Sequence, residues 1–424
     1  MKKLLFLLTP CIIFAQSFMT SNIPIPKTYL QNLDPFTCND RCMKELLQNG
    51  QIFSFLAHAN KKLTDKELNE ARTINIAVLN LGSSNTGTKL KIALLLPYNK
   101  IGKYASTTTN ATFAYLMTKS NSFMLKSYKI NKEDIADLQQ ALTQIEADGF
   151  TYVIAPLTTQ GVNNVIELNP QVNIYFPTIN KKDVNSFSSS LLFGGIDYKK
   201  QSQILLRQAV SPLVIFSDKS QTGKKLARYQ EEEFLHPTIE NNEIMSYENE
   251  VSVYYEDASH TEKKKVLKYF LSKRTTNLER YLKKNEDIVN GSFFVNTPII
   301  KTGMILSQLT LYDANATNIL STQINYDPLL LSMTQYNDRK NMVVANSITK
   351  ENNVLIETNS LLGNDIVYDW INYTTTIGID YFYSQITGED REYKIDISEN
   401  QMQYDIELLR PGISKFFRYT PQKE

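Results

Sequence analysis

The feature that most constrains the fold is an uninterrupted apolar run, Ile92–Leu96, which ends at Pro97. Strands buried on both faces read as continuous apolar runs, and such strands are typical of parallel sheets covered by helices. The expected elements that follow are a helix around 110–119, a helix over 135–147, a strand over 152–155, a helix near 161–168 and a strand over 173–177. This β-α-β-α-β order predicts an α/β sheet with right-handed crossovers.

A second round of alternation begins at residue 213 and predicts a second lobe. The expected elements are a strand over 213–216, a helix over 223–233, a strand over 251–255, a long charged helix over 259–284, and strands over 292–295 and 319–322. We interpret Lys263–Lys265 as the solvated face of the long helix rather than as a basic binding patch. Residues 368–383 predict an aromatic-rich helix, and residues 393–397 and 402–408 predict a hairpin across Glu399-Asn400.

The first residues have the pattern of a secretory signal peptide over 1–15. Lys2 and Lys3 precede an apolar stretch, and Ala15 is the expected end of the leader. The stretch spans about a dozen residues, whereas a membrane-spanning helix needs roughly 20. Cys11 follows Pro10 rather than the small residue of a lipid-attachment box. We therefore expect a periplasmic protein without a transmembrane anchor in the mature chain.

Loss of the leader leaves two of the three cysteines, Cys38 and Cys42. If this segment is helical, a spacing of four puts them on one face and within disulfide reach, in a compartment where disulfides persist. We predict a disulfide. A redox pair, which usually has two residues between its cysteines, and a metal site, which needs more ligands than are nearby, are less favoured.

Residues 16–88 are expected to form a helical arm and a linker. Helices are predicted between about residues 36 and 80, where Thr64 and Glu67 have the spacing of a capping box for the third. The composition of Gly82–Gly87 is that of a flexible linker.

Charge and motif content exclude several classes of function. The 45 Lys and Arg against 44 Asp and Glu leave a formal charge of +1, so no global field attracts the chain to nucleic acid. The three histidines offer few general bases, and the sequence contains no nucleophile elbow, zinc-protease motif or dinucleotide fingerprint. We predict no catalytic residues, no metal site and no cofactor.

Asn315 lies in the sequence Asp313-Ala314-Asn315-Ala316-Thr317. Asn-x-Ser/Thr also occurs at Asn110, Asn290 and Asn372, but only Asn315 has an acid two residues before it, as in the acceptors of bacterial N-glycosylation systems. Asn315 is therefore a candidate glycosylation site on a surface loop, and an ordinary polar turn is an equally favoured alternative.

Several segments in order resemble the type I periplasmic-binding-protein fold, and most closely the C-terminal domain of the LpoA activators of penicillin-binding proteins. The residues that carry the resemblance are Ile92–Pro97 with Gly102 and Tyr104-Ala105, Val153–Leu157, Leu213–Phe216 with Asp218 and Gly223, Gly378–Tyr381 and Gly388. It implies that residues 89–424 form one two-lobed domain with a cleft between the lobes.

The resemblance, and the general rule for open α/β sheets, place a ligand at loops that follow the carboxyl ends of the strands. The residues expected there are Tyr98, Asn99, Thr158, Thr159, Asp218, Tyr326 and Asp327. Their hydroxyl and carboxylate groups can hold a small zwitterion such as an amino acid. Family members usually have glycine at the positions of Thr108 and Ala155, where the backbone approaches closely. We therefore favour a cleft filled by tyrosine and other side chains.

Taken together, these observations favour a non-enzymatic periplasmic scaffold or regulatory protein that contacts an envelope partner such as a cell-wall synthase or an envelope machine. The alternative is a periplasmic solute-binding protein for an amino acid or similar small molecule, which closes its lobes by a hinge motion. LpoA proteins add a lipid anchor and a large helical-repeat domain, and the arm here is too short for three repeats. Activation of a cell-wall synthase is therefore not transferred directly.

Overall fold

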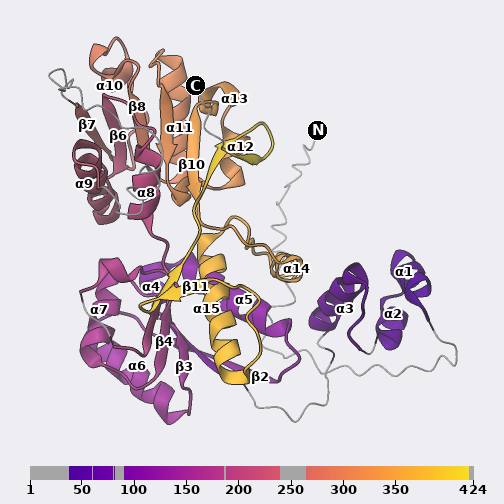
Figure 1. Cartoon of the computed structure of the whole chain (residues 1–424). Coiled ribbons are helices and arrows are strands. Elements are labelled where there is room, and N and C mark those ends of the chain that lie inside the picture. Colours follow the sequence, from indigo (N-terminus) through magenta and orange to yellow (C-terminus); the bar gives the residue numbers. More distant parts are fainter. Residues whose placement is uncertain are drawn as a thin grey trace, which may run out of the picture.

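The structure is a computed structural model that describes residues 38–59, 61–79, 81, 90–185, 188–238 and 264–419. The expected signal peptide, the linker and the strand over 251–255 lie outside the described residues. Figure 1 shows two α/β lobes, one above the other, with a helical arm beside the lower one. No helix among the described residues is both long and apolar enough to cross a membrane.

Lobe 1, the lower lobe in Figure 1, is built on a sheet with the strand order β11-β12-β5-β4-β3-β1-β2. Its strands are β1 (Leu90–Leu96), β2 (Phe123–Lys129), β3 (Tyr152–Ile154), β4 (Asn173–Phe176), β5 (Leu191–Phe193), β11 (Asp396–Ser398) and β12 (Gln401–Gln403). Its helices are α4 (Tyr98–Ile101), α5 (Lys103–Met117), α6 (Ile135–Ala147), α7 (Thr159–Leu168), α14 (Asn353–Leu361) and α15 (Trp370–Thr387). β1 to β5 pair in parallel. The sequence predicts a parallel sheet with β1, β3 and β4, but not the strands β2 and β5.

β1 lies between β3 and the edge strand β2, and helices cover both faces of its apolar run. Ile92 and Leu94 belong to the core on one face of the sheet, and Ala93 and Leu95 belong to the core on the other face. All four side chains are fully buried. Alternate residues of a strand point to opposite faces, so Ile92–Leu96, which is covered on both sides, has no polar residue.

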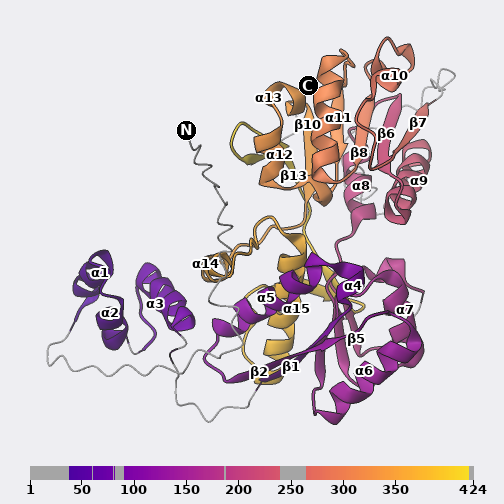
Figure 2. The same ribbon diagram turned by 180° about the vertical axis from the view of Figure 1, so that it is seen from behind.

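Lobe 2 follows a similar plan, with the strand order β14-β13-β10-β9-β8-β6-β7. Its strands are β6 (Leu213–Asp218), β7 (Val266–Leu271), β8 (Ser292–Asn296), β9 (Asn318–Ser321), β10 (Met342–Asn346), β13 (Glu407–Pro411) and β14 (Phe416–Arg418). Its helices are α8 (Tyr198–Leu206), α9 (Gln221–Leu235), α10 (Glu279–Leu282), α11 (Ile299–Leu311), α12 (Pro328–Met333) and α13 (Tyr336–Arg339). The chain crosses between the lobes from β5 to α8, from β10 to α14 and from β12 to β13 (Figures 1 and 2).

One predicted element is wrong. The long helix over 259–284 is replaced, within the described residues, by the edge strand β7 and the short helix α10. Phe216 of β6 stacks on Tyr269 of β7, with ring centres 5.3 Å apart. Short apolar runs fit both helical and strand periods, and the aromatic and β-branched residues here pack better on a sheet. Lys264 and Lys265 precede β7, so they do not form a helix face.

The hairpin near the C-terminus is confirmed in a shorter form. β11 and β12 are antiparallel, and Glu399 and Asn400 form the two-residue turn, with φ angles of 46° and 64°. Two residues with positive φ are typical of the turn that matches the twist of a hairpin. The residues that follow leave lobe 1 and enter β13 of lobe 2.

The N-terminal arm consists of α1 (Asp40–Gln48), α2 (Ile52–His58) and α3 (Lys66–Val78) and has its own small core around Phe55. A disulfide joins Cys38 and Cys42, whose Cα atoms are 5.3 Å apart. The cap of α3 differs from the prediction, because the side chain of Asp65, rather than that of Thr64, accepts the hydrogen bond from the N–H of Leu68. Helix α3 packs against α14 of lobe 1, which in turn contacts α5.

Candidate functional site

In lobe 1, the predicted cleft residues follow β1 and β3. Tyr98 and Asn99 begin helix α4 and are exposed. Thr158 caps α7, and both its N–H and its hydroxyl donate to the buried carboxylate of Glu133, with 2.9 Å between the Thr158 nitrogen and Oε1. Thr159 is the first residue of α7 and is half-buried. The hydroxyl of Thr158 is therefore already used to fix its own loop.

In lobe 2, the predicted cleft residues also have structural partners. Asp218 Oδ1 accepts hydrogen bonds from the N–H and the hydroxyl of Ser220, at 3.1 and 2.5 Å, and Ser220 caps α9. Asp327 caps α12 by accepting from the N–H of Leu329 at 2.8 Å. These carboxylates satisfy helix N-termini, which otherwise leave backbone N–H groups without partners.

Tyr326 belongs to an aromatic cluster that joins the two lobes. Its ring centre lies 4.9 Å from that of Tyr368, in the segment that leads into α15, and 4.9 Å from that of Phe416 in β14. Burial is the main cause that raises the pKa of Tyr326, and the nearby Tyr368 adds to it. We call Tyr326, Tyr368 and Phe416 the hinge cluster.

A second aromatic cluster joins the lobes at the start of α5 and α8. Trp370, the first residue of α15, makes edge contacts with Tyr104 of α5 and with Tyr198 of α8, with ring centres 6.2 and 6.3 Å apart. Burial raises the pKa of Tyr104 and of Tyr198 above the ordinary value of 10.0, because both phenols are withdrawn from water. We call Tyr104, Tyr198 and Trp370 the tryptophan cluster.

Asp369 lies beside the tryptophan cluster and begins α15. Its carboxylate accepts from the N–H groups of Ile371 and Asn372, at 2.9 and 3.3 Å. Burial raises the pKa of Asp369, although these hydrogen bonds and the charge of Lys103 act in the opposite direction. The carboxylate thus acts as a helix cap and has no nucleophile or imidazole among its described partners.

A buried amide network at the carboxyl edge of the lobe 2 sheet was not predicted. Gln201 of α8 donates to the hydroxyl of Ser347 at 2.8 Å and accepts from the N–H of Gln323 at 2.9 Å. Gln323 donates to Asn346 Oδ1 at 2.9 Å. The network ties α8 to the ends of β9 and β10. Isolated Gln and Asn residues carry no sequence pattern, so only the tertiary structure reveals it.

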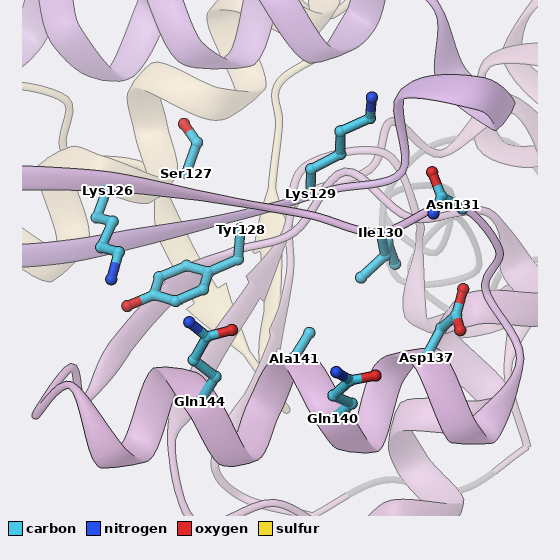
Figure 3. Close-up of a pocket in the computed structure, with 10 residues that line it drawn as sticks. All are labelled: Lys126, Ser127, Tyr128, Lys129, Ile130, Asn131, Asp137, Gln140, Ala141 and Gln144. Atoms are coloured by element: carbon cyan, nitrogen blue, oxygen red, sulfur yellow. The ribbon is translucent and has the colours of Figure 1, made fainter.

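A hollow of about 350 Å³ lies on lobe 1, in a groove between the edge strand β2 and helix α6 (Figure 3). Its lining residues are Lys126, Ser127, Tyr128, Lys129, Ile130, Asn131, Asp137, Gln140, Ala141 and Gln144. At one end, Lys126 and Tyr128 donate to the carboxylate of Asp148, at 2.5 and 2.7 Å. The hydrogen bond from Lys126 is the largest cause that lowers the pKa of Asp148.

Another hollow, of about 460 Å³, lies on lobe 2 around the loop that holds Asn315. None of the predicted cleft residues lines either hollow. Among the described residues, no group of three or more His, Cys, Asp and Glu side chains is placed to hold a metal ion.

Comparisons with known proteins agree with this architecture. No family model and no curated protein matches the sequence. Among solved structures, the leucine-binding protein LivK of Thermotoga maritima matches with a TM-score of 0.53 at 11% identity, over 78% of this chain and 98% of that one. The branched-chain amino acid binding protein LivJ of Streptococcus pneumoniae, in complex with isoleucine, matches with a TM-score of 0.54 at 10% identity, over 79% and 100%.

The C-domain of Haemophilus influenzae LpoA, a regulator of PBP1A, also matches, with a TM-score of 0.47 at 9% identity, over 78% of this chain and 100% of that domain. At such low identity the LivK and LivJ matches report on the fold alone. The two sheets, the parallel pairing of most of their strands and the crossings between the lobes indicate the same fold. The chain therefore has a two-lobed, type I periplasmic-binding-protein-like fold, preceded by a helical arm.

Proposed function

We propose that this protein is a non-enzymatic periplasmic scaffold or regulator that uses a binding-protein fold to contact another envelope protein, such as a cell-wall synthase or an envelope machine. The observation that carries the proposal is the aromatic packing between the lobes. The hinge cluster and the tryptophan cluster each combine side chains from both lobes.

Opening the lobes would expose these rings to water. Aromatic pairs contribute about 0.5–1.5 kcal/mol each beyond the burial of their surface. A protein that captures solutes by closing needs an open state of similar free energy. The packed rings instead favour a domain whose lobes stay together. The local partners of Thr158, Asp218 and Asp327 occupy groups that a solute would need.

The groove between β2 and α6 is the surface that we propose for the partner. β2 is the last strand of its sheet, so the main-chain groups on its outer side have no neighbouring strand among the described residues. An extended peptide can add to such an edge through main-chain hydrogen bonds. Gln140 and Gln144 of α6 are exposed and point toward β2, where their amides can bind the same peptide (Figure 3).

A solute-binding protein for an amino acid is the second candidate. The observation that favours it is that Tyr98 and Asn99, at the carboxyl end of β1, are exposed. Side chains at this place are well positioned to bind a small molecule in open α/β sheets.

One titration separates the two functions. Trp370 is the only tryptophan of the chain and lies between the lobes, so its fluorescence reports on ligand binding there. The purified protein is titrated with the standard amino acids while fluorescence and the melting temperature are recorded. A ligand at 100 times its dissociation constant stabilises by about 2.7 kcal/mol. The scaffold function predicts no change in either signal, and a saturable change would favour the solute-binding function.

A second experiment tests the partner directly. A photo-crosslinking amino acid is placed at Gln144 in the groove, and at the exposed Arg228 of α9 in lobe 2 as the matched control. In intact cells, one discrete adduct with an envelope protein at position 144, absent at position 228, is the expected result. Uncrosslinked monomer at both positions would contradict a partner at this groove.

A further inference from the structure

We propose that Asn315 is the acceptor of an N-linked oligosaccharide, a modification independent of the proposed function. Asn315 lies in the loop between α11 and β9, within Asp313-Ala314-Asn315-Ala316-Thr317. Asp313, Asn315 and Thr317 are all exposed. The structure therefore presents all three residues that an acid-requiring transferase reads.

The other three Asn-x-Ser/Thr sequences are occluded in the fold. Asn372 is fully buried in α15 and donates to Asn359 Oδ1 at 2.7 Å. Thr112, the hydroxyl residue after Asn110, is fully buried in α5. They lie within helices, whose backbone cannot adopt the extended form in which a transferase binds its acceptor.

The sequence at Asn290 is the closest competitor, because Asn290 is itself exposed. Its hydroxyl residue, Ser292, is fully buried in β8, where its oxygen accepts a hydrogen bond from the N–H of Val210 at 2.7 Å. The residue two positions before Asn290 is Ile288, so the acid is missing as well. Asn290 therefore serves as a matched negative control in the same region of lobe 2.

The backbone around Asn315 is held on both sides of the acceptor, by hydrogen bonds from the N–H of Ala314 to the carbonyl of Leu309 and from the N–H of Thr317 to the carbonyl of Gly291, both at 3.0 Å. Thr317 donates through its hydroxyl to the carbonyl of Asn290 at 2.6 Å, and the carbonyl of Asn315 accepts from the N–H of Asn290 at 2.9 Å. No hydrogen bond of the Asn315 side chain occurs among the described residues. Release of this one loop is a local opening, which costs less than unfolding the whole lobe. The loop can thus reach a transferase either before or after lobe 2 folds.

The hollow beside this loop provides room for the first sugars. It holds about 460 Å³ and is lined by the polar side chains Asn337, Asp338 and Asn341 next to the acceptor loop. Their amide and carboxylate groups can hydrogen-bond sugar hydroxyls. A glycan at position 315 therefore has space and polar partners, and it need not displace any part of the core.

The reaction transfers an oligosaccharide from a polyprenyl diphosphate carrier. The Asn315 side-chain nitrogen forms a bond to C1 of the first sugar, the bond between C1 and the phosphate oxygen breaks, and the polyprenyl diphosphate leaves. The nitrogen loses one proton to a base of the transferase. No oxidant or reductant is needed. The carrier lipid and the membrane-bound oligosaccharyltransferase must be supplied by the cell.

The test measures the intact mass of the full chain produced in a bacterial host that carries a periplasmic, acid-requiring oligosaccharyltransferase and its lipid-linked oligosaccharide. A known acceptor protein made in the same cells is the positive control. The expected mass exceeds that of protein from transferase-free cells by one glycan, and peptide mapping assigns the glycan to Asn315. N315Q abolishes the shift, whereas N290Q retains it.

The acid is tested with D313N, which keeps the side-chain shape. Asp313 has a φ of 50°, and asparagine tolerates this left-handed conformation whereas alanine is strained there. D313N is expected to lower the modified fraction at least tenfold, with an unchanged melting temperature. An unshifted mass in the wild type, a shifted mass in N315Q, or full modification of D313N would overturn the proposal.

Discussion

The ring of Tyr175 lies against the backbone of Gly378 in the middle of helix α15. A Cβ atom at position 378 would overlap this ring, and a Cβ atom at Gly194 would overlap its hydroxyl. The hydroxyl donates to the carbonyl of Thr374 at 2.6 Å. One fully buried side chain from β4 therefore fixes the distance between the end of β5 and the last long helix of lobe 1.

Gly378→Ala is expected to destabilise the protein. Replacing glycine by alanine inside a helix normally stabilises the folded state by about 1 kcal/mol, because alanine restricts the unfolded chain. Here the added methyl group meets a ring that has no room to move, and overpacking of a core costs about 1–3 kcal/mol, occasionally more. Urea unfolding of the two proteins measures the difference.

A double mutant distinguishes a clash with Tyr175 from a general effect on α15. Tyr175→Ala removes the ring and is itself expected to cost about 3–5 kcal/mol. In that background, Gly378→Ala should cost less than 0.5 kcal/mol or stabilise, because the space is then free. An equal cost of Gly378→Ala in both backgrounds would show that the ring is not the cause.

The lobe architecture can be predicted because local sequence patterns identify many of its strands and helices. β1 contains the unbroken apolar run Ile92–Leu96, and α6 has a clear amphipathic period, so both can be located from the sequence. β7 cannot be distinguished from a helix by its sequence, because its apolar run is short and fits both periods. The edge strands β2 and β14 are short or mixed in polarity, which leaves little periodic signal.

The candidate site was harder, because its character depends on side-chain partners from distant parts of the chain. Tyr326 was correctly placed after β9, yet its ring is engaged by Tyr368 and Phe416. The sequence predicts a ligand for the hydroxyl of Thr158, whereas in the structure this hydroxyl donates to Glu133. Local sequence indicates where a loop lies, but not which neighbour satisfies its polar groups.

Trp370→Ala is expected to loosen the contact between the lobes. Trp370 is half-buried, so its loss should cost about 1–3 kcal/mol, less than for a fully buried tryptophan. Hydrogen exchange should speed up at the starts of α5 and α8, whose Tyr104 and Tyr198 lose their partner. Tyr336→Ala, at an exposed tyrosine of lobe 2, is the control and should change stability by no more than about 0.5 kcal/mol.

Asp380 should make a contribution to the stability of the protein that decreases as the pH rises. Its fully buried carboxylate accepts from the hydroxyl of Tyr115 at 2.7 Å and from the N–H groups of Glu392 and Tyr393 at 2.8 and 3.1 Å. Burial nevertheless raises its pKa above the ordinary value of 3.8, despite these bonds and the charge of Lys119. The folded state thus holds the proton of Asp380 more tightly than the unfolded chain does. The contribution of Asp380 to stability is therefore largest below its ordinary pKa, and it declines as the pH rises through the pKa of the folded state.

Urea unfolding of D380N between pH 4 and 8 checks this sign. D380N should be less stable than the wild type at every pH, because the new amide group faces a backbone N–H. The difference in unfolding free energy between D380N and the wild type should narrow as the pH rises. D148N is the opposite control. Asp148 has a lowered pKa because Lys126 and Tyr128 donate to it, so the difference in unfolding free energy between D148N and the wild type should stay constant from pH 8 to 4 and narrow only below the ordinary pKa of 3.8. A gap for D380N that widens with rising pH would contradict the assignment.

Reduction of the disulfide between Cys38 and Cys42 should destabilise the arm and leave the lobes intact. The bond closes a loop of about five residues, for which the chain-entropy relation gives about 2 kcal/mol. The arm has its own core around Phe55, separate from the cores of the lobes, so it can unfold locally. With reductant, hydrogen exchange should accelerate in α1 and α2 while β1 stays protected, and a double Cys38→Ser, Cys42→Ser variant should behave alike without reductant. Alkylation of either thiol before reduction would show that the disulfide does not form.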